Sequence, residues 1–271
     1  LAALMPFPST YVAVAVAILA VTVFVVLPLK EPPRAAAPAR EGGALRAIAG
    51  ELRLFVRDSW RAFTGSRAAL VGLVVALLPA GAYALSLALQ SNLAVELGFD
   101  DNAVARLNLA TTVIFAFACI AGGWLSDRYG RRRTLALFVF LTALPTLWLA
   151  WAMQQAPWIM PVDIGAPNRP KPPDALVMTF WIANFAFSVA QGLYYGVRTA
   201  LYMDVTTKAV AATQFTAYMA LSNLAISYTA WWQGHAVTRW GYPVTLVLDA
   251  LAGLVMIALL PLMRPPPAAR S

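Results

Sequence analysis

Charged residues are scarce in this sequence. Of its 271 residues only 12% are charged, with 20 Lys and Arg against 12 Asp and Glu, while 61% are hydrophobic. A soluble domain has about a quarter of its residues charged, so this composition argues against soluble enzymes, secreted disulfide scaffolds and nucleic-acid-binding modules. The net charge of +8 does not change that conclusion, because the basic residues sit in short loops rather than in one patch.

Residue types that carry chemistry are scarce as well. The single cysteine, Cys119, cannot form an intrachain disulfide. The single histidine, His235, stands at an expected helix end without clustered metal ligands, so we expect no metal, no cofactor and no membrane enzyme. The three lysines, Lys30, Lys171 and Lys208, do not lie deep in an apolar run, which excludes a retinal protein with a Schiff-base lysine.

Long uncharged runs are what the sequence does contain. Six of them are 20 residues or longer, and a seventh run, 240–263, is interrupted only by Asp249. Because a helix needs about 20 apolar residues to cross a bilayer, the sequence predicts an all-α, polytopic membrane bundle of seven spans. We place these spans at 9–29, 69–92, 105–126, 134–154, 175–203, 213–235 and 242–263.

The basic residues are distributed unevenly between the two sides of this bundle. The connections on one side, together with the C-terminal tail, carry fifteen Lys and Arg, and those on the other side carry four. Basic loops stay in the cytoplasm, so the first side is predicted to be cytoplasmic. The N-terminus of the chain is then outside and its C-terminus inside.

The segment 30–67 separates the first span from the other six and has two parts. Residues 30–43 are rich in Pro, Ala and Arg, as is typical of a flexible linker. From Leu45 to Phe63 apolar residues recur at three- and four-residue spacing while arginines point away. This pattern predicts an amphipathic helix on the inner membrane surface, with a protein-binding helix as the alternative.

A charged motif joins the third and fourth spans. It reads Gly123-Trp124-Leu125-Ser126-Asp127-Arg128-Tyr129-Gly130-Arg131-Arg132-Arg133. We expect Gly123 to let two helices approach closely, Asp127 to pair with a nearby arginine and Gly130 to permit a sharp reversal. The arginines keep this turn out of the hydrocarbon. A generic cytoplasmic loop would explain the arginines, but not Asp127 and the two glycines in register with them.

This motif resembles the signature of the major facilitator superfamily, Gly-x-Leu-x-Asp-Arg-x-Gly-Arg-Arg/Lys, at every fixed position. The resemblance implies two six-helix halves, with the signature between the second and third helix of a half. It assigns 1–29 to the last helix of an N-terminal half, 30–67 to the cytoplasmic linker, and 68–271 to a six-helix C-terminal half. We therefore expect a missing N-terminal half of the same protein as a partner. A seven-helix receptor has the same number of spans but does not explain the signature.

The last three spans carry a narrower resemblance. Gln191-Gly192, the aromatic-rich stretch that follows, and Ala212-Thr213-Gln214-Phe215 are similar to the muropeptide permease and acetyl-coenzyme A transporter branch. This resemblance implies proton-coupled import of a muropeptide or similar sugar-peptide across the bacterial inner membrane. An exporter of amphipathic drugs is the alternative. The expected partners are a small-molecule solute, protons and the lipid bilayer, with no nucleic acid.

Polar side chains recur at helical spacing in the second and fifth spans, and each set shares one helix face. Such side chains are costly in lipid and normally face the bundle interior or a water-filled cavity, so they are candidates for the substrate pathway. Interhelical hydrogen bonding without solute contact is the alternative. The candidates are Tyr83, Ser86 and Gln90, and Trp181, Asn184, Ser188, Gln191, Tyr195 and Arg198. Asn108, Thr111 and Thr112 are secondary positions, and the apolar fourth span is expected to be peripheral.

Two charged residues fall inside expected spans and clear of the span ends. Arg198 suits bidentate binding of a substrate carboxylate, or alternatively snorkels to the inner surface beside Asp204. Asp249 is a proton-coupling candidate, since an unpaired carboxylate at its depth tends to be protonated. Pairing of Asp249 with Arg239 or His235 is the structural alternative.

Overall fold

The computed structural model describes residues 7–28, 44–86, 88–156, 171–207 and 210–263, and all regular structure within these ranges is helical. The chain divides into two units, Leu1–Ala49 and Gly50–Ser271. The first unit contains α1 (Phe7–Val21), which η1 (Thr22–Val26) continues as a π-helix. Of the linker expected at 30–67, residues 30–43 lie outside the described part of the chain, and most of the rest is helical.

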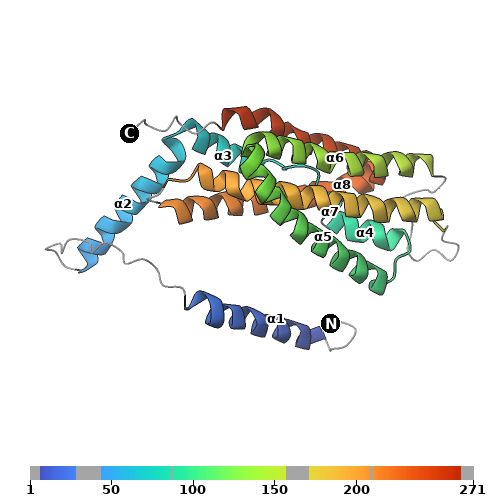
Figure 1. Ribbon diagram of the computed structural model, residues 1–271, viewed down its shortest axis with the longest axis horizontal. Coiled ribbons are helices and arrows are strands. Elements are labelled where there is room, and N and C mark those ends of the chain that lie inside the picture. Colours follow the sequence, from blue (N-terminus) through green and yellow to red (C-terminus); the bar gives the residue numbers. More distant parts are fainter. Residues whose placement is uncertain (1–6, 29–43, 87, 157–170, 208–209, 264–271) are drawn as a thin grey trace. The chain divides into compact units, whose positions relative to one another are not determined.

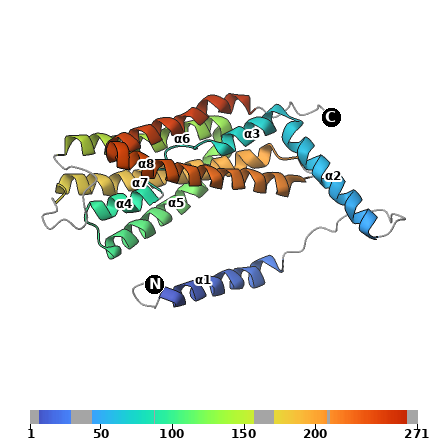
Figure 2. The same ribbon diagram turned by 180° about the vertical axis from the view of Figure 1, so that it is seen from behind.

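The second unit is a bundle whose long helices run beside one another (Figures 1 and 2). Its elements are most of α2 (Ala44–Thr64), then α3 (Arg67–Leu77), α4 (Ala88–Glu96), α5 (Asp101–Tyr129), α6 (Arg131–Gln155), α7 (Asp174–Asp204), α8 (Ala211–Leu259) and η3 (Leu260–Leu262). Among the described residues, four helices are long and apolar enough to cross a membrane, or up to five if α2 and α3, bent by 84°, form one span. These helices support an integral membrane protein, while the number of seven spans stays a prediction.

Helix α8 reverses direction at Gly241, where φ is 78°. The amide Nε2 of Gln233 donates to Oδ1 of Asp249 over 2.7 Å, although the two residues are 16 positions apart. A straight helix would separate them by about 24 Å, so α8 consists of two antiparallel arms, drawn in orange and red in Figure 1. The arms correspond to the separate spans expected at 213–235 and 242–263.

The expectation of one continuous helix at 69–92 is wrong. Helix α3 ends at Leu77 and α4 begins at Ala88, with non-helical backbone between them. Leu78 is extended, as residues before a proline tend to be, and Pro79 follows it. Gly81 then takes a positive φ of 84°, which glycine adopts readily. These residues break the helix into two short pieces.

Non-helical backbone inside a membrane bundle must find hydrogen-bond partners, because lipid offers none. Four consecutive amides of the break, from residue 81 to residue 84, donate to α6 or to the second arm of α8. The acceptors are the Gly253 carbonyl for Gly81 (3.2 Å), Thr142 Oγ1 for Ala82 (3.0 Å), and Asp249 Oδ2 for Tyr83 (2.8 Å) and Ala84 (2.9 Å). The break is therefore a fixed part of the bundle.

Burial differs between the helices of the bundle. Half of the residues in the apolar stretch of α6 are buried, against 11% in α5, while Leu137 and Trp151 of α6 are exposed. Leu135, Val139 and Leu149 of α6 are fully buried. One face of α6 packs against other helices and the opposite face exposes apolar side chains, so the expected peripheral position of the fourth span stays a prediction.

Candidate functional site

A cavity of about 410 Å³ opens where the break, α4, α5, α7 and the first arm of α8 meet. Its lining combines hydroxyl and amide side chains with a few aromatic and aliphatic ones. Six of the nine residues predicted for a substrate pathway line it: Tyr83, Ser86, Gln90, Ser188, Gln191 and Tyr195. The secondary positions Asn108, Thr111 and Thr112 of α5 line it as well.

Phe115 also lines the cavity, and the polar pattern did not single it out. Its ring meets that of Tyr195 edge to face, with centroids 5.5 Å apart. It follows Thr111 by four residues and so shares the face of α5 that carries the polar positions. Its helical spacing from Thr111 is the sequence signal that indicates Phe115.

Three members of the predicted stripe on α7, Trp181, Asn184 and Arg198, do not line the cavity. Trp181 stacks on Phe99 with ring centroids 5.5 Å apart and packs among aromatic residues. Asn184 is fully buried and its Oδ1 accepts from Gln90 Nε2 over 2.8 Å, which ties α7 to α4. The contact between Asn184 and Gln90 is an interhelical hydrogen bond, which was the alternative to a substrate pathway.

Arg198 is only 2% exposed and lies six residues before the end of α7. Its guanidinium carbon is 5.1 Å from the ring centre of Tyr194 and 5.0 Å from that of Tyr195. In the described ranges, no acidic side chain forms an ion pair with it, and its Nε has no hydrogen-bond partner. Asp204, the partner expected for snorkelling, pairs with Arg131 instead.

The two tyrosine contacts do not offset the burial of this charge. A cation–π contact contributes about 0.5–2 kcal/mol, whereas the effective penalty for burying an ion is several kcal/mol. A buried cation without a counter-ion is a functional-site candidate in a membrane protein.

Asp249 is 1% exposed and uses both carboxylate oxygens. Oδ2 accepts from the Tyr83 and Ala84 amides of the break, and Oδ1 accepts from Gln233. Neither residue of the expected pairing with Arg239 or His235 contacts it: His235 contacts the Trp231 carbonyl, and Arg239 lies over Trp240. Asp249 thus anchors the break, from the second arm of α8.

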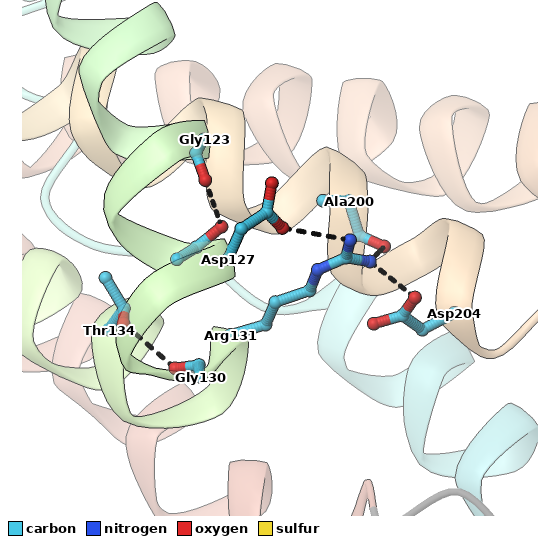
Figure 3. A network of polar contacts seen from close by, with 8 residues as sticks. Gly123, Asp127, Gly130, Arg131, Thr134, Ala200 and Asp204 are labelled. Atoms are coloured by element: carbon cyan, nitrogen blue, oxygen red, sulfur yellow. Dashed lines mark hydrogen bonds and ion pairs between the residues drawn. The ribbon is translucent and has the colours of Figure 1, made fainter.

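The charged motif lies at the junction of α5 and α6 (Figure 3). Gly130 has a φ of 91° and forms the reversal predicted for it. Arg131 donates to Asp127 over 3.2 Å, to the Ala200 carbonyl over 3.1 Å, and to Asp204. The expected pairing of Asp127 with a nearby arginine is present, and Arg131 extends it to the end of α7.

The other motif residues have separate roles. Gly123 does not mediate close packing as expected, because a Cβ there would meet nothing within 4 Å. The neighbouring Gly122 does, since its Cβ would lie 2.6 Å from Leu193 Cα on α7. Arg128 lies over the Trp124 ring at 5.9 Å, and Arg132 lines a hollow of about 560 Å³ beside Arg131.

Within the parts of the chain that the structure describes, no group of three His, Cys, Asp or Glu could hold a metal ion. The candidate site consists of the polar cavity, the buried charged residues Arg198 and Asp249, and the charged motif at the junction of α5 and α6.

Comparison with known proteins identifies the family. No curated protein and no solved structure matches the chain. The model of the Major Facilitator Superfamily matches residues 1–166 and, in a second overlapping match, residues 71–271. Together these matches cover the whole chain and include the motif around Gly130 and the cavity residues. The chain therefore belongs to the Major Facilitator Superfamily, a family of integral membrane proteins whose members are secondary transporters rather than enzymes.

Proposed function

We propose that this chain forms part of a proton-coupled transporter that moves a small polar solute, of the muropeptide or sugar-peptide class, across a bacterial inner membrane. The observation that carries the proposal is the cavity of about 410 Å³. Its hydroxyl and amide groups match the hydrogen-bonding groups of sugars and peptides. An amphipathic drug would leave these polar groups without partners, which costs binding free energy.

The broken helix beside the cavity supports the same proposal. Transporters commonly place solute sites beside discontinuous helices, because irregular backbone is tolerated only where it is buried in protein or lines a cavity. Here the break between α3 and α4 contributes Tyr83 and Ser86 to the lining.

The remaining wall of the pathway is proposed to come from an N-terminal half of the same protein. Only 11% of the residues in the apolar stretch of α5 are buried, yet this helix carries the cavity residues Asn108 and Thr111. A second half packed on this face would enclose the cavity. With the charge asymmetry, the proposal also places the C-terminus of the chain in the cytoplasm.

Uptake by the full-length protein tests this function. Proteoliposomes with an imposed proton gradient receive labelled N-acetylmuramyl dipeptide or a labelled cationic dye. Dipeptide uptake that needs the gradient and falls in Gln191→Ala supports the proposal, with exposed Gln154→Ala as the matched control. Dye transport without dipeptide uptake would favour the drug exporter. Dipeptide uptake that is indifferent to Gln191 would remove the cavity from the pathway.

A further inference from the structure

Arg198 is a buried cation whose surroundings contain unused hydrogen-bond donors. The hydroxyls of Tyr83 and Tyr194 are buried and lie close to each other, and neither has another hydrogen-bond partner among the described residues. The rings of Tyr194 and Tyr195 contact the guanidinium, whose carbon is 5.1 Å and 5.0 Å from their centres. Buried donors normally find acceptors, so two adjacent hydroxyls with no other partner, one of them on a ring that contacts a guanidinium with a free Nε, are an unusual concentration of donors.

These donors come from two separate elements. Tyr83 belongs to the break, while Tyr194 and Arg198 belong to α7. The Asp249 carboxylate fixes the backbone of Tyr83, with a bond of 2.8 Å to its amide. A fixed break and a long helix therefore place the donors without help from a ligand.

The donor group adjoins the polar cavity. Tyr83 and Tyr195 line that cavity, and the Tyr195 ring centre is 5.0 Å from the Arg198 guanidinium carbon. The cation thus lies directly behind the cavity wall, with tyrosine rings between it and the open space.

We propose that Arg198, with the hydroxyls of Tyr83 and Tyr194, binds the carboxylate of the transported solute. A guanidinium offers two parallel N–H donors in the geometry of a carboxylate, and the two hydroxyls supply donors for its remaining lone pairs. One cation balances one negative charge, so a monoanion fits better than a dianion such as phosphate. The inference rests on the proposed transport function, since it assigns the solute's charged group.

Anion binding by the full-length protein in detergent tests the site without transport. The probes are N-acetylglycine, which carries a carboxylate, and the neutral N-acetylglycinamide, which has the same size. Thermal unfolding at increasing probe concentration gives an apparent affinity for each. We expect N-acetylglycine to raise the melting temperature with an affinity at least tenfold above that of the amide.

Three variants identify the residues that bind. Arg198→Gln should abolish the preference for N-acetylglycine over its amide. Arg198→Lys keeps the charge but loses the two parallel N–H donors of the guanidinium, and should reduce this preference about tenfold or more. Tyr83→Phe should weaken it several-fold. Arg239→Gln removes an exposed arginine elsewhere on the bundle and should leave it unchanged.

The outcomes separate this proposal from the proposed function. Equal stabilisation by acid and amide, no stabilisation by the acid, or an undiminished preference in both Arg198 variants would overturn the carboxylate site. A normal acid preference in a protein that takes up no dipeptide would instead leave the site standing and contradict the proposed solute.

Discussion

Asp249 can be replaced in two ways that separate its structural role from a role in proton transfer. Asp249→Ala removes the acceptor for three buried donors, the amides of Tyr83 and Ala84 and the side chain of Gln233. Each unsatisfied buried donor costs about 1–3 kcal/mol, so we expect a loss of about 3–9 kcal/mol. A loss of this size approaches the whole stability of many proteins, about 5–15 kcal/mol.

Asp249→Asn should be much milder. Its single carbonyl oxygen can still accept from both amides of the break. Its NH₂ group would then face Gln233, whose Oε1 is buried and has no partner in the described chain. Rotation of the Gln233 amide by half a turn brings that oxygen into place as an acceptor. Only the contribution of charge is lost, which we put at about 1–3 kcal/mol.

Titration with sodium dodecyl sulfate in mixed micelles measures both free energies of unfolding. The matched controls are Asp101→Asn and Asp101→Ala, because Asp101 is exposed in the first turn of α5. Their effects should stay within about 0.5 kcal/mol. Equal losses for the two Asp249 variants, or no loss in Asp249→Ala, would refute the anchoring role.

The same Asp249→Asn protein decides the question of proton coupling. The variant imitates a protonated carboxyl group and keeps the break in place. Uptake that no longer responds to a proton gradient, in a stable variant, would assign the coupling proton to Asp249. Normal coupling would leave this residue with the anchoring role alone.

Two further predictions concern the backbone and the topology. Gly130→Ala should lower the free energy of unfolding by about 1–2 kcal/mol, because φ is 91° there. Gly234→Ala, at a helical glycine with open space around it, is the control and should not lower it. Equal unfolding midpoints for the two variants would contradict this prediction. In a Cys119→Ser background, cysteines placed at Thr64 and Gln155 should react with an impermeant reagent from opposite sides of the membrane. Labelling of both from one side would contradict the orientation derived from the basic residues.

Long uncharged runs were a reliable guide where the helix is continuous. The runs predicted at 105–126 and 175–203 lie within α5 (Asp101–Tyr129) and α7 (Asp174–Asp204). The reversal at Gly130 was also predictable, because a glycine between two apolar runs has a direct conformational meaning. These features depend on residues that are near one another in the sequence.

The break between α3 and α4 shows where this reasoning fails. Leu78-Pro79-Ala80-Gly81 is a helix-breaking signal that could have been recognised, but hydropathy alone treated the run as one span. The partners that make the break stable could not have been found this way. Thr142 and Asp249 are 60 and 166 positions from the amides of Ala82 and Tyr83.

The break also explains how helical spacing can give the correct residues for an incorrect reason. Tyr83, Ser86 and Gln90 were grouped because they would share one face of a continuous helix. Tyr83 and Ser86 belong to the break and Gln90 belongs to α4, yet all three line the cavity. The informative signal was a polar residue inside an apolar run, because polar side chains are costly in lipid and normally face the interior of the bundle.

Tyr83 connects the two buried charges of the bundle. Its amide donates to Asp249, and its side chain lines the cavity together with Tyr195, whose ring centre is 5.0 Å from the Arg198 guanidinium carbon. In a continuous helix this amide would bond to its own turn, so only the break makes it available to Asp249. Asp249→Ala should therefore weaken carboxylate binding as well as the fold, because it frees the backbone that positions Tyr83. Asp249→Asn keeps an acceptor for that amide and should retain carboxylate binding, even if it loses its response to protons.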